Sequence, residues 1–115
     1  NIDRTSKQLV ISKSYKDFRV LKNLNVNNIW FQNEGAFPEN LQEIVGDFED
    51  VVIFFDNDEA GLKAADKLNL LINNSRVVHF DTALLARGIK DPADMYSRKG
   101  VEALKNFLLQ NNIKT

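Results

Sequence analysis

The sequence contains no cysteine and a single histidine, His79. A chain without cysteine can form neither a disulfide framework nor a thiolate metal site. One histidine likewise argues against a histidine-rich zinc centre. A metal site in this chain would therefore have neither thiolates nor a histidine cluster to use.

Long apolar runs and an excess of positive charge are also absent. No apolar run approaches the length needed to span a bilayer, and the N-terminus lacks a signal-peptide core, so we expect a cytoplasmic protein with no membrane partner. The net charge is −1, from 15 basic and 16 acidic residues. No global positive field therefore indicates nucleic-acid binding, and any such binding must be local or metal-mediated.

The composition is that of a folded domain. The 115 residues include 43% hydrophobic residues, eight phenylalanines and only two prolines. This length suits one domain with a real core and is too short for two, so we interpret residues 1–115 as a single domain. The chain begins at Asn1 rather than methionine, which fits a segment of a larger protein, although a processed or trimmed N-terminus would look the same.

Hydrophobic periodicity predicts strands that alternate with helices along the chain. This alternation predicts an α/β fold with a sheet of about four strands, largely parallel, and helices on both faces. Ser14 is the expected N-cap of the first helix, and residues 81–94 are expected to form a long connection. The predicted strands span residues 8–11, 28–32, 51–55 and 76–80, and the predicted helices span residues 16–25, 39–46, 58–73 and 101–111.

An acidic cluster follows the predicted central strand directly. The apolar run Val51–Phe55 stops at Asp56, Asp58 and Glu59. In an open α/β sheet, ligands bind beyond the carboxyl ends of the strands, and acids two residues apart on an extended segment point the same way. Such hard oxygen donors suit Mg²⁺ or Mn²⁺. The alternative is that either acid alone caps the following helix.

Basic side chains near the same edge are candidates for phosphate contact: Lys13, Lys16, Arg19 and Lys90. Lys13 ends the first predicted strand and would face the same crevice, where it could hold a triphosphate as a point charge. The alternative for Lys16 and Arg19 is the solvated face of the first helix.

Two segments carry a resemblance to a known family. Residues 55–65, with the sequence FDNDEAGLKAA, and residues 90–94, with the sequence KDPAD, resemble motifs of the toprim domain. This compact, Rossmann-like metal-binding fold occurs in bacterial-type primases, type IA and type II topoisomerases and some nucleases. The resemblance covers nearly the whole chain. The KDPAD segment favours the primase branch, and the segments KSYKD and QNEG further resemble phage-encoded primases.

The resemblance implies the toprim part of a DNA primase. It implies metal-dependent nucleotidyl transfer, with RNA primer synthesis from nucleoside triphosphates on a single-stranded DNA template. The implied catalytic residues and metal ligands are Asp56 and Asp58, and Asp94 is a further implied metal ligand. Asp91 and Asp94 would hold a second metal or make outer-shell contacts, although Asp91-Pro92 is also an ordinary turn and helix start. Expected partners are other domains of the parent chain and a replicative helicase. The alternatives are a toprim-type nuclease or topoisomerase domain and a non-catalytic, metal-dependent nucleic-acid-binding module.

The first family motif departs from the usual pattern. Toprim domains normally end the first strand with Glu-Gly; here Lys13 stands in place of the Glu, and only Asp17 of that motif is retained. Our favoured hypothesis is that Glu34, after the second strand, replaces the missing carboxylate as a catalytic residue and metal ligand. Adjacent parallel strands lie only about 4.8 Å apart, so Glu34 and Asp56 would share one sheet edge. The competing hypothesis is that the domain has lost its chemistry and only binds.

Other interpretations fit the residues less well. A calcium-binding loop would need a ligand at Ala60 and a bidentate glutamate at Lys67. A receiver domain needs an acidic pair after its first strand, where residues 12–14 read Ser-Lys-Ser, and a dehalogenase-type phosphatase needs further motifs that we do not find. The adjacent aromatic residues Trp30 and Phe31 could stack on bases, but we interpret them as core.

Overall fold

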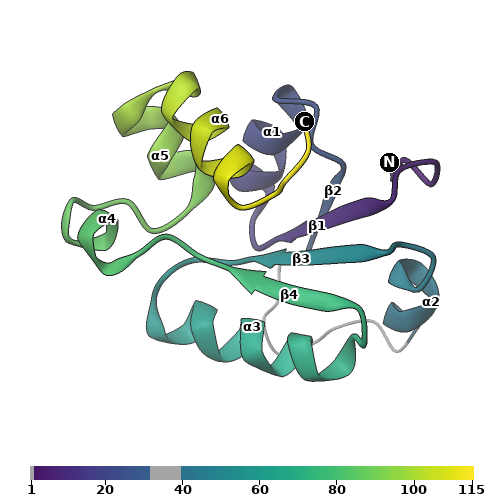
Figure 1. Ribbon diagram of the computed structural model, residues 1–115. Coiled ribbons are helices and arrows are strands. Elements are labelled where there is room, and N and C mark those ends of the chain that lie inside the picture. The colour runs from purple at the N-terminus through teal and green to yellow at the C-terminus, as the bar shows by residue number, and fades with distance from the viewer. Residues whose placement is uncertain (1, 32–39) are drawn as a thin grey trace.

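The computed structural model describes residues 2–31 and 40–115. Four strands form one sheet in the order β2-β1-β3-β4, and every neighbouring pair is parallel (Figure 1). The predicted α/β class and the four-stranded parallel sheet are confirmed, with strand ends shifted by one or two residues. The strands are β1 (Gln8–Ser12), β2 (Asn28–Trp30), β3 (Asp50–Phe54) and β4 (Ser75–Val78).

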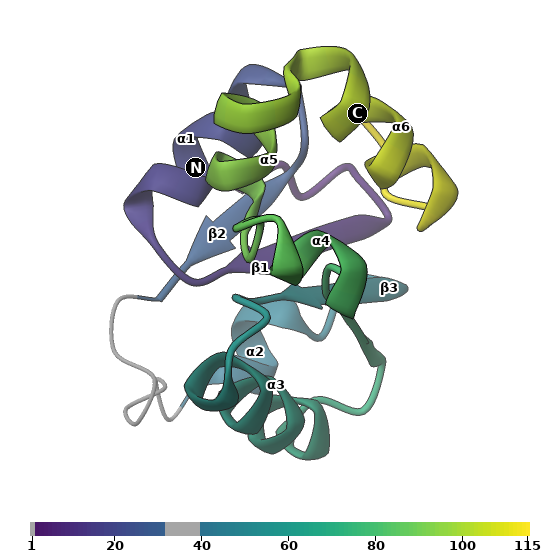
Figure 2. The ribbon, with the colours of Figure 1, turned by 90° about the vertical axis from the view of Figure 1, so that its left-hand side faces the viewer.

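Helices cover both faces of this sheet, as predicted. Figures 1 and 2 show α1, α5 and α6 on one face and α2 and α3 on the other. Among the described residues, no helix is both long enough and apolar enough to cross a membrane. The helices are α1 (Tyr15–Asn23), α2 (Leu41–Val45), α3 (Glu59–Leu71), α4 (Thr82–Ala86), α5 (Pro92–Lys99) and α6 (Val101–Gln110).

The central strand β3 divides the core into two halves because successive side chains of a strand point to opposite faces. Val52 and Phe54 pack in the cluster under α1, α5 and α6, whereas Val51 and Ile53 pack in the cluster under α2 and α3. All four side chains are fully buried. A strand buried on both faces explains why its sequence is continuously apolar rather than alternating.

The segment 81–94 differs from the predicted connection, because it contains α4 and the start of α5. Helix α4 has five residues, none of them buried, so it is too short and too exposed to show an apolar period. Helix α5 begins at Pro92 with Asp91 as its N-cap, so the helix-start alternative for Asp91-Pro92 is confirmed. Both helix starts depend on a capping aspartate rather than on a hydrophobic pattern.

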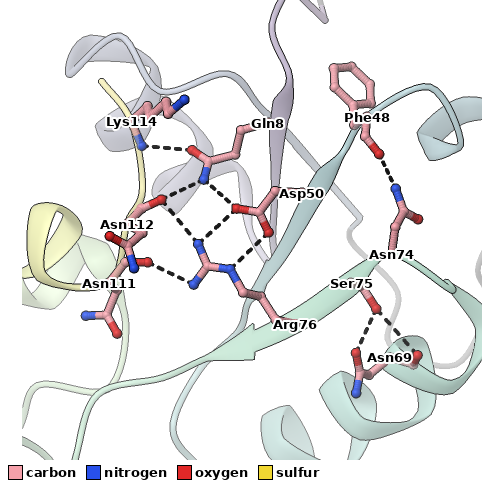
Figure 3. A network of polar contacts seen from close by, with 10 residues as sticks. All are labelled: Gln8, Phe48, Asp50, Asn69, Asn74, Ser75, Arg76, Asn111, Asn112 and Lys114. Atoms are coloured by element: carbon pink, nitrogen blue, oxygen red, sulfur yellow. Dashed lines mark hydrogen bonds and ion pairs between the residues drawn. The ribbon is translucent and has the colours of Figure 1, made fainter.

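A polar network joins the amino ends of β1, β3 and β4 (Figure 3). Arg76 Nε and Nη2 donate to Asp50 Oδ1 at 2.9 Å and Oδ2 at 3.0 Å. Gln8 Nε2 donates to Asp50 Oδ2 and to the Asn112 carbonyl, and Arg76 Nη1 donates to the Asn111 carbonyl. The hydrogen bond from Arg76 lowers the pKa of Asp50 despite partial burial. The network thereby fastens the segment after α6 to the sheet.

Candidate metal centre

Three aspartates meet beyond the carboxyl ends of the strands: Asp17, Asp56 and Asp91. Each offers one carboxylate oxygen, and these oxygens all lie within 4.8 Å of one another. Asp17 lies in the first turn of α1, Asp56 lies just after β3, and Asp91 caps α5. Residues far apart in the sequence are therefore brought to one edge of the sheet, where α/β folds bind ligands.

Asp17 is held between two helices. Its side chain is only 1% exposed. The predicted N-cap of α1 is confirmed: Ser14 Oγ accepts a hydrogen bond from the Asp17 amide at 3.2 Å and donates one to Asp17 Oδ2 at 3.1 Å. Asp17 Oδ1 accepts from the Ala93 amide at 3.0 Å. Asp17 thus couples the start of α1 to the start of α5.

Asp91 is the N-cap of α5. Its side chain is 3% exposed, and its Oδ1 accepts a hydrogen bond from the Asp94 amide at 2.8 Å. The Asp94 carboxylate turns back to the Lys90 amide, with 3.2 Å between Asp94 Oδ2 and the nitrogen. The KDPAD segment is therefore a capped helix start that directs Asp91, rather than Asp94, into the three-acid cluster.

Asp56 differs from the other two acids because one of its oxygens has no partner. Asp56 Oδ1 is buried and accepts no hydrogen bond among the described residues. A buried acceptor left unpaired costs about 1–3 kcal/mol, so its retention needs an explanation such as a bound ion. This oxygen is buried, has no hydrogen-bond partner in the described part of the chain and lies next to two further carboxylates, which makes it the strongest structural sign of a cation site.

The loop that carries Asp56 is tightly packed. A Cβ at position 61 would lie 2.2 Å from the Asp56 carbonyl oxygen, so only glycine allows α3 to begin so close to β3. The Asn57 amide donates to the Lys90 carbonyl at 2.8 Å, and Asn57 Nδ2 donates to the Phe80 carbonyl. These contacts hold Asp56 between the amino end of α3 and the chain that leads to α5.

Asp58 lies beside the cluster and caps α3. Its Oδ1 accepts a hydrogen bond from the Gly61 amide at 2.7 Å. The alternative that Asp58 caps the following helix is therefore confirmed. Its Oδ2 lies 4.0 Å from Lys90 Nζ. Asp58 therefore supports the loop that holds Asp56 and offers its second oxygen toward the basic side chain of Lys90.

The three-acid cluster is electrostatically unfavourable when its members are charged. Burial, followed by the charge of Asp91, raises the pKa of Asp17 to about 7. The same two causes, in the same order, raise the pKa of Asp56 to about 6, against the opposing influence of Lys90 and Lys13. At neutral pH, protons or a cation must relieve this repulsion.

The arrangement fits a hard divalent cation. The donor set consists of carboxylate oxygens, which Mg²⁺ and Mn²⁺ prefer. Two of the acids are almost completely buried and fixed by hydrogen bonds, so little ordering would be needed for binding. Asp17, Asp56 and Asp91 are the residues that would hold such an ion.

The predicted site residues have different outcomes. Lys13 and Lys90 lie close enough to Asp56 to influence its pKa, whereas Lys16 is exposed on α1. Glu34 falls outside the described residues, so its replacement role stays a prediction.

Sequence reasoning did not place Asp17 among the metal ligands, although Asp17 is the retained acid of the first family motif. It left Asp91 undecided between a metal contact and a helix start. The signal for both residues was the family motif, since neither shows a local pattern that distinguishes a ligand from a helix cap.

Known proteins resemble this chain over most of its length. The family model described as Toprim-like matches residues 10–96. A DNA primase of Campylobacter jejuni is 27% identical over 103 residues, which cover 89% of this chain and 17% of that protein. A DNA primase of Helicobacter pylori is 28% identical over 107 residues, which cover 89% of this chain and 18% of that protein. The chain therefore spans less than a fifth of the length of these curated relatives.

A solved structure shares the fold. The primase fragment of the bacteriophage T7 primase-helicase protein superposes with a TM-score of 0.69 at 18% sequence identity. The match covers 90% of this chain and 43% of that one. At this identity the likeness shows the common fold.

Proposed function

The chain belongs to the Toprim-like family, and from this premise we propose that it is the metal-binding domain of a DNA primase. In this proposal residues 1–115 form one domain of a longer protein that makes RNA primers on a single-stranded DNA template. The DNA primases among its relatives support the reaction, and the 17–18% of their length that the chain covers supports its dependence on further domains. A replicative helicase would be a partner of that longer protein.

The observation that carries the proposal is the three-acid cluster with its orphaned oxygen. Nucleotidyl transfer passes through a highly charged transition state, so a protein catalyses it mainly by positioning phosphates and neutralising charge. A divalent ion bound at the cluster would polarise phosphate oxygens and help to align the 3′-hydroxyl with the triphosphate.

The chain's own residues then have distinct roles. Asp17, Asp56 and Asp91 would bind Mg²⁺ or Mn²⁺, and burial would keep competing water away from Asp17 and Asp91. Lys13 and Lys90, whose charges already act on Asp56, would attract the triphosphate as point charges. The role of this group is to bind and orient.

We propose that Asp58 and Asp94, which lie outside the cluster, hold in place the chain segments that carry the metal ligands. Asp58 and Asp94 each place one carboxylate oxygen on a backbone amide, of Gly61 and Lys90 respectively. A group that positions ligands in this way typically contributes ten- to a hundredfold to metal affinity. Glu34 remains our proposed replacement for the carboxylate that Lys13 displaces from the first motif.

Primer synthesis by the full-length protein tests the function. We expect Mg²⁺-dependent synthesis on a single-stranded template, lost in Asp56→Asn and retained in Lys67→Gln, a substitution of an exposed α3 residue. Robust strand cleavage without synthesis would overturn the primase proposal in favour of a nuclease or topoisomerase domain. Metal and DNA binding with neither reaction would favour the non-catalytic module, which the lysine at position 13 supports.

A metal titration tests the ligand set. Mg²⁺ and Mn²⁺ would be added to the 115-residue chain while backbone amide shifts are recorded. We expect saturable shifts around Asp17, Asp56 and Asp91 that weaken in Asp17→Asn and Asp56→Asn. Glu34→Gln separates the two hypotheses for that residue, because unchanged metal affinity and primer synthesis would remove it from the site.

A further inference from the structure

Aromatic and basic side chains gather on the outer side of α1, next to the metal centre. The Tyr15 side chain is 53% exposed. Its ring centroid lies 6.2 Å from that of Phe18, in a stacked arrangement, and 5.8 Å from that of Trp30 at the end of β2. With Lys16 and Arg19, these three rings form what we call the α1 patch.

Cations lie close to these rings. Arg19 Cζ is 5.8 Å from the Tyr15 ring centroid, and Lys22 Nζ is 5.7 Å from the Phe18 ring centroid. A surface pocket of about 400 Å³ opens beside them. The pocket is lined by Tyr15, Lys16, Arg19, Val20 and Asn23.

The α1 patch is not required by the core. Helix α1 buries Asp17 and Leu21 on its inner side, while Tyr15, Lys16 and Arg19 are exposed. From the sequence we interpret Trp30 and Phe31 as core residues. Phe31 does pack against the core. Trp30 is only partly buried, and it lies on the edge strand β2. The exposed Tyr15 ring, which two partly buried rings support and which cations flank, is more than a solvated helix face needs, so this arrangement indicates a binding surface.

The chemistry of the α1 patch matches a single nucleic-acid strand. Unpaired bases stack on exposed aromatic rings, and neighbouring cations contact the phosphates between them. Arginine beside a ring also contributes cation–π attraction. The chain's net charge of −1 gives no global attraction for DNA, which makes such a local combination of rings and cations more significant.

We propose that the α1 patch binds single-stranded DNA, with a base on Tyr15 and Trp30 and flanking phosphates on Lys16 and Arg19. Tyr15 precedes the cluster residue Asp17 by two positions on the same helix. The α1 patch and the metal centre therefore share the first turn of α1, with Tyr15 on its exposed side and Asp17 on its buried side. This inference rests on the proposed primase function, to which it adds the surface that holds the template strand.

Trp30 is the only tryptophan in the chain, so tryptophan fluorescence reports on binding at the α1 patch itself. A deoxythymidine oligonucleotide would be titrated into the 115-residue chain at low salt with EDTA, so that the metal centre takes no part. We expect saturable quenching. Affinity should fall about tenfold in Tyr15→Ala and recover in Tyr15→Phe, because stacking needs the ring rather than the hydroxyl.

The salt dependence tests the phosphate contacts. Lys16→Gln and Arg19→Gln should each reduce the slope of log affinity against log salt by about 0.7, the amount expected for one phosphate contact with a single strand. Tyr96→Ala and Lys67→Gln are matched controls, since they remove an exposed tyrosine of α5 and an exposed lysine of α3. A duplex of the same length should bind more weakly, because its base faces are already stacked.

Several results would overturn the inference. These are wild-type affinity in both Tyr15→Ala and Arg19→Gln, equal losses in the control variants, or equal affinity for the duplex. Primer synthesis separates this failure from failure of the proposed function. If Asp56→Asn abolishes synthesis while α1-patch variants bind DNA normally, the function stands and the α1 patch does not. If α1-patch variants lose DNA binding but the wild-type protein makes no primers, the α1 patch stands as a DNA-binding surface and the proposed function fails.

Discussion

The two ends of the parallel sheet use the same kinds of side chain in opposite ways. At the amino ends of the strands, Asp50 receives a bidentate contact from Arg76, and its pKa is lowered. At the carboxyl ends, Asp56 faces further acids, one of its oxygens accepts no hydrogen bond, and its pKa is raised to about 6. The amino edge therefore stabilises the folded chain by itself, whereas the carboxyl edge gathers like charges that a bound cation would neutralise.

This difference distinguishes structural polar groups from functional ones. Charges that serve only the fold are expected to be paired and hydrogen-bonded, as Asp50 and Arg76 are. A cluster of like charges that lowers stability persists where it serves binding or chemistry. Substitutions at the two edges should therefore have opposite effects on stability and on function.

The largest effect is expected for Asp56→Asn at the carboxyl edge. Primer synthesis by the full-length protein should fall by about 10²–10³-fold, because the substitution removes a charge needed to hold the ion. The metal-free chain should become more stable by about 1 kcal/mol, because repulsion with Asp91 is relieved. Urea unfolding in EDTA measures the second effect. A loss of stability would show that Asp56 is structural rather than functional.

A large effect on stability is expected for Gly61→Ala. The new Cβ would lie 2.2 Å from the Asp56 carbonyl oxygen, so the loop must move, at a cost of about 2–3 kcal/mol. Metal affinity should fall with it, which a Mn²⁺ titration would detect. Gly100→Ala is the matched control: its φ of 89° costs about 1 kcal/mol, but nothing lies within 4 Å of the added Cβ and metal binding should persist. Equal losses of metal affinity in both variants would contradict this explanation.

Arg76→Gln tests the amino edge. We expect the free energy of unfolding to fall by about 1–2 kcal/mol, a value discounted because Arg76 and Asp50 are about one-third exposed. Metal affinity should not change, since the network lies at the opposite end of the strands. Chemical denaturation and a metal titration on the same sample check both statements. A weaker metal site in this variant would mean that the two edges are coupled.

The smallest effect is a pH dependence that differs between the edges. Asp17 and Asp56 have folded-state pKa values of about 7 and about 6, above the ordinary value of 3.8, so the folded chain binds protons more tightly than the unfolded chain. Their contribution to the free energy of unfolding is fully present below pH 4 and is lost as pH rises through 6 and 7. The pKa of Asp50 is lowered, so its contribution is lost only as pH falls below 4.

Urea unfolding in EDTA between pH 4 and pH 8 measures this dependence. The decline toward neutral pH should flatten in Asp17→Asn and on addition of Mg²⁺, because an ion replaces the protons. A decline of the same size in Asp17→Asn would assign the dependence to other groups.

Sequence patterns predicted the sheet and the longer helices because those features are local. The apolar run at residues 51–54 and the amphipathic period of α3 show the burial of each segment directly. Helix α4 was missed because its five residues, none of them fully buried, are too few to show a period. At the site, the position of Asp56 after the central strand was predictable, since strand and acid are adjacent in the sequence.

The sequence by itself thus determined the fold class, the strands and the presence of acids at their carboxyl ends. Tertiary structure alone decided which acids meet. Asp17 reaches the cluster because α1 packs on α5, where the Ala93 amide, 76 residues away, binds its carboxylate. Asp58 and Asp94 instead bind amides within their own turns. A local pattern records the period and polarity of a segment, whereas the burial and mutual distance of side chains depend on the packing of distant elements.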